Sequence, residues 1–514
     1  MSYVVEQKIK GRIYLYNVES YWDKGKKQAR QKRTYIGPKN GKNKTSLRAK
    51  KTDLISKNYG NIFLLNCLSD KLTIKQILKS VFPDNYLEIL ALAYYDIIDA
   101  SPMYLFHYWL NEQYLSNVKK LRSSKISDLC EYLGRSEKQR MNVIDKWAEY
   151  LKPIKGIFYD ITSISSFSTN IDFIEWGYNR DKEKLPQLNM GVTFCQNNLL
   201  PIHYNLYPGS IVDVTTLKNC VKTLDIFHLH EILFVLDRGF FSKANILEMN
   251  NRKNKVTFLQ PLPFSLKKVK ELANKYKRKI SNTSNAFKFN NEILHYMPAS
   301  IDFDGVKFNV HIYFNEKAEI DQKHHFLSSL LEIEKKIKNK KFNSMVEYLA
   351  FRDTNIPNKY MVYFKWNKTS FYIERNVRVI NSHISKMGIF LILTNCEKIN
   401  KEEVLKNYRQ RDNVEKIFDI LKNEIDGNRL RAHSQYNVNG RLFIKFISMI
   451  LYAEISKTMK NTNLFNQYSV KELFAELKKL KMVKINDDVS FLSEISKKQK
   501  NIFKAFEVME KIKT

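Results

Sequence analysis

The chain has 514 residues, of which 44% are hydrophobic, and this composition excludes a disordered polypeptide. Because the length exceeds what one hydrophobic core accommodates, we expect roughly two to four domains. Lysine and arginine number 86 against 53 aspartate and glutamate residues, and the resulting net charge of +33 is spread along the whole sequence. This excess predicts a polyanionic partner, and nucleic acid is the first candidate because Lys and Arg release its counterions on binding.

Three further features narrow the class of protein. No apolar run reaches the length of about 18 residues that a membrane-spanning helix requires, so we expect no membrane partner. The five cysteines are scattered without a CxxC pair, which argues against zinc and disulfides and for a reduced cytosolic protein. The first residues lack an apolar signal region, so we expect a cytoplasmic location. An AT-rich coding sequence would explain part of the lysine excess, but it explains the deficit of acids less well.

Residues 1–60 predict a small antiparallel β region followed by a basic linker. Apolar and polar residues alternate over residues 12–18, the pattern breaks at residues 23–25, and it resumes toward Ile36. The cations that follow Gly37 are typical of a solvated linker. An arm that contacts phosphates is the alternative interpretation.

Residues 61–152 have a helical period and predict the DNA-binding part of the chain. A turn at residues 134–136 separates two helical stretches, which is compatible with a helix-turn-helix. The cations on the second stretch are Lys138, Arg140 and Lys146. Two ordinary helices joined at a glycine would give the same pattern, so both interpretations stay open.

Residues 153–263 contain short apolar runs that meet acidic residues. A β-prone run at residues 157–161 contains Asp160, and an unbroken apolar run at residues 232–236 leads directly into Asp237. An apolar run of this kind predicts a central strand, and functional groups collect where the strands of open α/β sheets end. We therefore expect the first part of an α/β domain here.

The rest of the sequence predicts an interruption of that domain, its completion and a tail. Residues 264–386 mix alternating runs with one charged helical stretch, and we expect a mainly β insertion subdomain. Residues 387–456 contain a buried strand and a helix and predict the second part of the α/β domain. Residues 457–514 predict a helical C-terminal region, with a capping-box pattern at residues 469–472.

The helix predicted after the last of these strands carries an unusual polar edge. At about 100° per residue, Tyr408, Arg411, Glu415 and Lys422 fall within a sector of roughly 60°. This edge borders the predicted core-facing stripe, which consists of Val414, Ile417, Phe418, Leu421 and Ile425. Such a position lets the acid meet groups from a sheet beneath the helix. An ordinary amphipathic helix with flanking charges is the alternative.

Three acids in separate segments could converge. Asp160, Asp237 and Glu415 would supply hard oxygen ligands for two Mg²⁺ ions if their strands and helix share one site. Residue patterns alone do not separate these three from other acids that have plain surface roles as their alternative. The other acids are Asp172, Asp181, Asp213, Asp412 and Asp419.

Several motifs together resemble one known family. The segments that carry the resemblance are Tyr159-Asp160-Ile161-Thr162, Leu236-Asp237-Arg238-Gly239-Phe240, Leu393-Thr394-Asn395 and the spacing of Tyr408, Arg411, Glu415 and Lys422. They resemble the DDE transposases of bacterial insertion sequences, the group with a Tyr-Arg-Glu-Lys signature helix and a β-rich insertion. The resemblance covers roughly residues 153–450.

This resemblance implies a fold and a set of roles. The fold is a ribonuclease-H-like mixed α/β sheet with a mainly β insertion, an α+β N-terminal region and a helical tail. Asp160, Asp237 and Glu415 would bind two Mg²⁺ ions, for which Mn²⁺ would substitute. The residues implied to hold DNA phosphates are Tyr408, Arg411, Lys422 and Arg238. Trp366 would stack on a flipped base, with a cross-strand aromatic as its alternative role.

The implied activity is DNA transposition. The protein would bind the terminal inverted repeats of its insertion sequence, cleave the ends by metal-dependent hydrolysis and join the 3′ ends to target DNA. Its partners would be double-stranded DNA and a second copy of the chain, as a homodimer on DNA in the bacterial cytoplasm. A degenerate or domesticated copy that binds DNA without cutting it is the main alternative, followed by a DNA-binding regulator and a structure-specific nuclease.

Overall fold

A computed structural model describes the protein over residues 2–39, 54–168, 171–178, 184–211, 213–226, 232–251, 256–337, 340–367, 369–412, 429–430, 432–485 and 489–512. The chain divides into two compact units. One is built from residues 1–57 with 481–493, and the other from residues 58–480 with 494–513.

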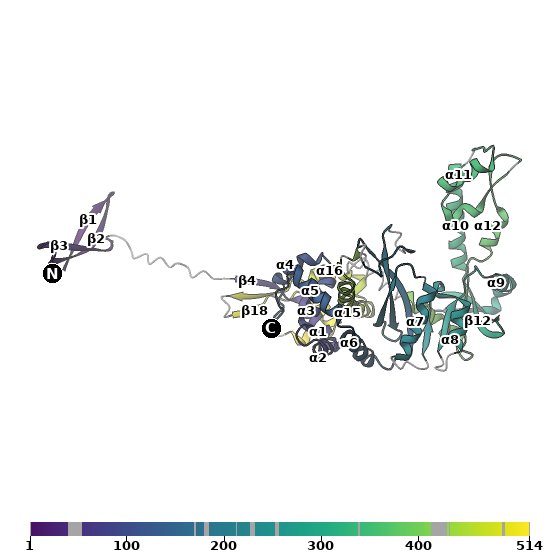
Figure 1. Ribbon diagram of the computed structural model, residues 1–514, viewed down its shortest axis with the longest axis horizontal. Helices are drawn as coiled ribbons and strands as arrows, with labels where there is room; N and C mark the ends of the chain where they lie inside the picture. Colours follow the sequence, from purple (N-terminus) through teal and green to yellow (C-terminus); the bar gives the residue numbers. More distant parts are fainter. Residues whose placement is uncertain are drawn as a thin grey trace. The chain divides into compact units, whose positions relative to one another are not determined.

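The first unit contains two small antiparallel sheets. The strands of the N-terminal sheet, in the order β1-β2-β3, are β1 (Ser2–Ile9), β2 (Arg12–Asp23) and β3 (Gln28–Pro38) (Figure 1). Lys10 and Gly11 adopt positive φ in the turn after β1, which glycine allows without a Cβ clash. The strands of the second sheet, in the order β18-β17-β4, are β4 (Leu54–Asn58), β17 (Lys481–Ile485) and β18 (Val489–Leu492). The C-terminal region is therefore not purely helical.

Helices from both ends of the second unit pack together. They are α1 (Gly60–Lys71), α2 (Ile74–Val81), α3 (Tyr86–Ile98), η1 (Met103–Leu105), α4 (Phe106–Glu112), α5 (Ser123–Arg135), α6 (Glu137–Tyr150), α15 (Gln435–Asn461), η5 (Leu464–Asn466), α16 (Val470–Leu477), α17 (Lys497–Ala505) and η6 (Met509–Lys511) (Figure 1). Helix α15 carries apolar side chains on all of its faces, so it is buried along most of its length. It packs against α5 and α3. It thus joins the helical region, although the sequence places it in the α/β domain.

Two glycines allow α5 and α15 to approach closely. A methyl group at Gly134 would overlap the backbone of Tyr436, and one at Gly440 would overlap the backbone of Cys130. The helices are thus in contact through their main chains, which only glycine permits at these positions.

None of the described helices is by itself long and apolar enough to cross a membrane, although the sharply bent pair Tyr86–Ile98 and Met103–Glu112 passes this test together.

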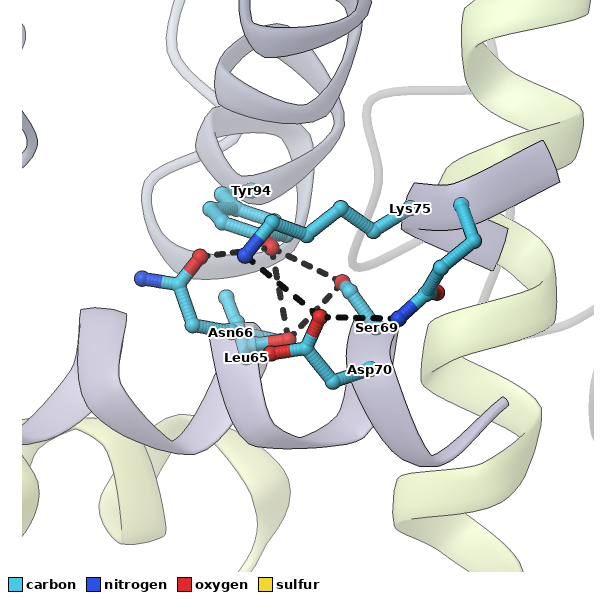
Figure 2. A network of polar contacts seen from close by, with 7 residues as sticks. Leu65, Asn66, Ser69, Asp70, Lys75 and Tyr94 are labelled. Atoms are coloured by element: carbon cyan, nitrogen blue, oxygen red, sulfur yellow. Dashed lines mark hydrogen bonds and ion pairs between the residues drawn. The ribbon is translucent and has the colours of Figure 1, made fainter. Parts of the chain in front are cut away.

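A buried polar network ties α1 to α3 (Figure 2). The Tyr94 hydroxyl lies 2.8 Å from Ser69 Oγ, and it also lies 3.3 Å from the Leu65 carbonyl oxygen and 3.1 Å from Asn66 Oδ1. Burial raises the pKa of Tyr94 well above its usual value, so the phenol stays neutral. Each of these contacts satisfies a polar atom inside the helical core, which is a structural role.

A ten-stranded sheet forms the centre of the second unit. Its strands are β5 (Gly156–Ser166), β6 (Gln187–Cys195), β7 (Pro201–Pro208), β8 (Leu233–Val235), β9 (Thr257–Pro261), β10 (Ala286–Phe289), β11 (Glu292–Phe303), β12 (Val306–Phe314), β15 (Ile389–Thr394) and β16 (Arg429–Leu430). The order is β10-β11-β12-β15-β9-β8-β5-β6-β7, and β16 pairs with β5. Strands β5, β8 and β9 are parallel to one another, whereas β6, β7 and β15 pair antiparallel with their neighbours. The fold is therefore a mixed α/β arrangement around one large sheet.

Helices cover this sheet and connect it to the helical region. The helices α7 (Asp213–Ile226) and α8 (Lys243–Asn250) pack against each other beside the sheet (Figure 1). On the β7 side, Trp147 of α6 is fully buried and its indole Nε1 donates a 2.7 Å hydrogen bond to the Pro201 carbonyl. The nine residues of β6 are all buried because both faces of that strand are covered.

Residues 264–386 differ from the expected mainly β subdomain. Strands β10 to β12 extend the central sheet through the pairing of β12 with β15. The helices of this region are α9 (Lys267–Ile280), η3 (Thr283–Asn285), α10 (Glu316–Ile337), α11 (Met345–Asn355), η4 (Asn358–Tyr363) and α12 (Val377–Ile384). Among the described residues of this region, only the two-stranded sheet of β13 (Phe364–Trp366) and β14 (Ile373–Arg375) stands apart from the central sheet. The expectation of a mainly β insertion is therefore wrong.

Aromatic spacing explains why part of the insertion is helical. Tyr360 and Tyr363 are three residues apart, which matches the repeat of a 3-10 helix and places both rings on one side. Both rings contact Phe326 of α10, with centroid distances of 6.4 and 4.9 Å. The insertion helices thereby bury their own hydrophobic cluster, to which Ile380 of α12 also belongs.

Candidate active site

Two of the predicted carboxylates lie at equivalent positions along neighbouring parallel strands. Strands β5 and β8 are parallel, with Phe158 opposite Val235. Asp160 and Asp237 each follow two residues later, so the register carries both acids to equivalent positions on adjacent chains. The pairing of the two strands thus brings together two acids that lie far apart in the sequence.

The backbone around the two acids is held by local hydrogen bonds. Asp237 caps the 3-10 helix η2 (Arg238–Phe240), and its carbonyl oxygen accepts a 2.8 Å hydrogen bond from Gln260 Nε2 of β9. Asp160 Oδ1 accepts a 2.8 Å hydrogen bond from the Ile161 amide. Both carboxylates are half-buried, so each is fixed in position and still borders solvent.

Helix α13 (Lys401–Gln410) brings a cation to Asp237. The helix begins after Asn400, whose side chain caps the Glu403 amide. Arg411 follows its last turn, and Arg411 Nη1 lies 2.6 Å from Asp237 Oδ1. The Arg411 side chain is 10% exposed and the Asp237 side chain 38% exposed. A nearly buried guanidinium thus neutralises one of the two acids.

Polar contacts with β6 set the position of α13. Gln196, which follows β6, donates from Nε2 to Asn407 Oδ1 at 2.6 Å and to Gln410 Oε1 at 3.3 Å. The backbone amide of Gln196 donates a hydrogen bond to the Gly156 carbonyl at the start of β5. These contacts tie the helix that carries Arg411 to the strand that carries Asp160. The sequence did not reveal this role of Gln196, because an isolated glutamine carries no motif.

Tyr408 lies within the same group of charges. Burial raises the pKa of its phenol, while Arg411 acts in the opposite direction and Asp237 adds to the rise. The Arg411 guanidinium carbon is 5.6 Å from the centre of the Tyr408 ring. A neutral hydroxyl beside a guanidinium suits a hydrogen bond to a phosphate oxygen.

The other half of the predicted signature helix lies outside the described residues. Glu415 and Lys422 both fall there, as does Asp419. Among the described residues, no group of three or more His, Cys, Asp or Glu side chains is placed to hold a metal ion. Asp160 and Asp237 are nevertheless the hard oxygen donors that Mg²⁺ prefers, and two carboxylates fit such an ion as part of a larger ligand set.

A cavity of about 790 Å³ lies between the central sheet and the insertion helices, and neither Asp160 nor Asp237 lines it. Arg238, the residue after Asp237, contributes to its wall. The other side chains that define its character are Phe264, Tyr360, Tyr363, His383 and Lys386. Aromatic rings together with cations are the groups that recognise nucleotides. The aromatic pair of η4 was missed from sequence because its run was assigned to a strand.

Trp366 does not line that cavity. It lies on β13 opposite Ile373, and its indole Nε1 is buried without a hydrogen-bond partner among the described residues. The arrangement resembles the cross-strand aromatic role more than an exposed stacking platform.

The helices α5 and α6 do not present the expected basic surface. Arg140 is buried, and its guanidinium donates to the carbonyls of Leu133 and Gly134 at the end of α5. The Arg140 guanidinium therefore does not belong to an exposed basic surface. Lys138 and Lys146 are exposed, and Lys146 Nζ donates to Ser80 Oγ at 2.8 Å. The exposed face of α6 also carries three acids, Glu137, Asp145 and Glu149. These acids oppose binding of a phosphate backbone.

Comparison with known families matches residues 152–451 to the family described as the transposase DDE domain. The match spans more than half of the chain, and the protein belongs to this family of transposases. Among solved structures, a cryo-EM structure of the piggyBac transposase synaptic complex with hairpin DNA aligns at a TM-score of 0.35 and 12% identity. That alignment covers 82% of this chain and 70% of the other. Curated proteins gave no match.

Proposed function

We propose that this protein is the transposase of a bacterial insertion sequence. It binds the terminal inverted repeats of the element, cleaves the DNA ends by hydrolysis and joins the 3′ ends to target DNA. The observation that carries the proposal is the parallel register of β5 and β8, in which Asp160 and Asp237 each come two residues after the Phe158–Val235 pair, in a chain of the DDE family. The net charge of +33 supports a DNA partner.

We further propose a ribonuclease-H-like core. The support comes from strand order and direction, because β7-β6-β5-β8-β9 places three antiparallel strands first in the chain and two parallel strands after them. In this reading β10 to β12 and β15 extend the core at the edge beyond β9. The acids then sit at the centre of the sheet, where β5 and β8 meet.

The proposed metal ligands are Asp160, Asp237 and Glu415. Two Mg²⁺ ions bound there, or Mn²⁺ in their place, would activate the attacking oxygen and stabilise the leaving oxygen. The protein then needs no nucleophile of its own, and its other side chains position DNA. Arg411 offers a guanidinium fork to a phosphate. The remaining proposed phosphate contacts are Tyr408, Lys422 and Arg238.

The cavity beside Arg238 is the better place for a base that leaves the helix. We assign this role to Tyr360 and Tyr363 in place of Trp366, because the two tyrosines line the cavity and Trp366 does not. Lys386 on the same wall would accept the accompanying phosphate. The protein would act as a homodimer on double-stranded DNA in the bacterial cytoplasm.

The test is cleavage of duplexes that carry the DNA flanking this gene, with Mg²⁺ or Mn²⁺. Asp160→Asn, Asp237→Asn and Glu415→Gln should each abolish cleavage and retain DNA binding. The matched control is Asp412→Asn, because this acid is exposed next to Arg411 and is not a proposed ligand. Cleavage by all three variants would refute the proposed ligand set.

The products distinguish the alternatives. Wild-type protein that binds the duplex and leaves it intact would identify a degenerate or domesticated copy. Cleavage without joining of 3′ ends to a second duplex would identify a nuclease. Joined products with a short target duplication would support transposition.

A further inference from the structure

The geometry of the N-terminal sheet points to a second DNA-binding surface, and we infer that one face of β1–β3 enters the major groove of duplex DNA. This inference rests on the proposed function, because that function supplies the duplex. It concerns a surface that lies outside residues 152–451, which match the transposase family. This surface, the aromatic face, is one side of the sheet β1–β3, and the strand register determines its residues.

Register assigns each residue of the sheet to one of two faces. Residues directly opposite each other in antiparallel strands project on the same side, and neighbours along a strand alternate. Tyr3 pairs with Val18, and Val18 pairs with Arg33. Tyr16 likewise pairs with Tyr35. The aromatic face consequently contains Tyr3, Gln7, Arg12, Tyr14, Tyr16, Trp22, Gln31, Arg33 and Tyr35.

The composition of the aromatic face suits nucleic acid. Three of its rings are well exposed, with Trp22 at 62%, Tyr35 at 53% and Tyr3 at 48%. The Tyr35 ring packs against Tyr14 and Tyr16, with centroid distances of 5.9 and 5.4 Å, so the rings form a continuous layer. Exposed aromatic rings on one continuous surface are typical of a site that a partner covers.

Charge separates the two faces. Within residues 2–39 the ten cations are Lys8, Lys10, Arg12, Lys24, Lys26, Lys27, Arg30, Lys32, Arg33 and Lys39. The three acids of the same range, Glu6, Glu19 and Asp23, all lie on the opposite face by register. Two of these acids are paired with cations, Glu6 with Lys39 and Asp23 with Arg30. Within residues 2–39, the aromatic face therefore bears arginines and no carboxylate, which complements a polyanion.

The dimensions favour the major groove over the minor groove. The outer strands of a three-stranded sheet lie about 10 Å apart, from two spacings of about 4.8 Å. The major groove is about 12 Å wide and admits a two-stranded β-ribbon, so two neighbouring strands of this sheet fit into it, whereas the minor groove is about 6 Å wide. The polar groups on the aromatic face, two arginines and two glutamines, are the side chains that read guanine and adenine edges there. The turns at both ends of the strands add cations that would meet the flanking phosphates.

Adjacent residues on one strand supply matched variants of the full-length protein. Trp22 and Tyr21 are neighbours on β2, both are exposed, and they project from opposite faces. Arg33 and Lys32 form a second such pair on β3. The probe is the duplex that flanks this gene, and affinity is measured over a salt series without divalent metal.

We expect Trp22→Ala and Arg33→Ala each to weaken duplex binding about tenfold. Tyr21→Ala and Lys32→Ala should retain wild-type affinity. Trp22→Phe should restore most of the loss, which a purely structural defect would not predict. Circular dichroism establishes that each variant keeps its fold.

Equal affinities for the two members of each pair would overturn the assignment of the face. If Trp22→Ala and Arg33→Ala weakened binding to single-stranded DNA and left binding to duplex DNA intact, the assignment to the major groove would be overturned. Because binding is measured without metal, this test is independent of cleavage. Failure of wild-type protein to cut the same duplex with Mg²⁺ would instead count against the proposed function.

Discussion

Replacing Arg411 with alanine should strengthen divalent-metal binding, because its guanidinium and a metal ion compete for the Asp237 carboxylate. Arg411 Nη1 and Asp237 Oδ1 are 2.6 Å apart. With charge centres about 4 Å apart, an effective dielectric constant of about 20 gives an attraction of about 4 kcal/mol. Because the Asp237 side chain is 38% exposed, solvent reduces this value to about 1–2 kcal/mol. We therefore expect Mn²⁺ affinity to rise about tenfold.

The assay is calorimetric titration of the DNA-free protein with Mn²⁺. Arg409→Ala is the control, because Arg409 lies on the same helix and pairs with Glu292 at 2.6 Å. It removes the same charge from the chain and should leave Mn²⁺ affinity unchanged. The double variant Arg411→Ala with Asp237→Asn should lose the gain. Unchanged or weaker Mn²⁺ binding by Arg411→Ala would refute the competition. If Arg411 also contacts phosphate, the Arg411→Ala protein should bind cleaved DNA ends more weakly, although it binds Mn²⁺ more tightly.

Three other predictions concern stability. Gly440→Ala should lower the free energy of unfolding by about 1–3 kcal/mol in denaturant titration, because the methyl group overlaps the Cys130 backbone. Trp147→Phe should cost about 1–3 kcal/mol, because it leaves the buried Pro201 carbonyl without its donor. Burial lowers the pKa of His203 from 6.5 to about 4, so the unfolded chain binds a proton that the folded chain excludes. Stability should therefore fall as pH decreases from 6.5 toward 4, by about 3 kcal/mol for this group, and His203→Gln should flatten that part of the pH profile.

Each stability prediction has a control. Gly25→Ala meets no atom closer than 3.5 Å outside its chain neighbours, so it should leave unfolding unchanged. Tyr150→Phe removes a hydroxyl that is exposed in the same helix as Trp147, and it should cost little. A Gly440→Ala protein as stable as the wild type would mean that α5 and α15 can move apart freely. A pH profile that is identical with and without His203 would mean that the imidazole is accessible to solvent in the native state.

The strands that carry the two aspartates were predictable from sequence, and their pairing was not. An apolar run that ends in an acid, as at Asp237, reads as a buried strand because polar residues are excluded from such runs. Nothing in that run states which strand lies beside it. The parallel register with β5 joins segments that lie far apart in the sequence, and local patterns do not encode such a pairing.

The errors have a common physical origin in tertiary contacts that override local patterns. Arg140 looks like a surface cation, yet its long side chain turns back to cap the preceding helix. Tyr360 and Tyr363 lie in an alternating run, yet packing on Phe326 selects a 3-10 helix. The contact of Arg411 with Asp237 joins residues far apart in sequence, so no spacing rule announces it. The sequence thus indicates which side chains carry charge or aromatic rings, but it does not indicate which residues those side chains contact.

Strands β9 and β15 make the insertion a removable module. Ile392 lies opposite Pro261 in this antiparallel pair, and the Leu262 amide donates to the Leu391 carbonyl. On the other flank, the Asn395 side chain donates to the Val256 carbonyl and accepts from the Phe258 amide. The chain thus leaves the sheet and re-enters it at neighbouring points, so a tight hairpin could replace everything between them. Length changes during evolution, or a fusion partner inserted in the laboratory, would then be absorbed at this junction without displacing Asp237, which follows the neighbouring strand β8, or Asp160 on the next strand β5.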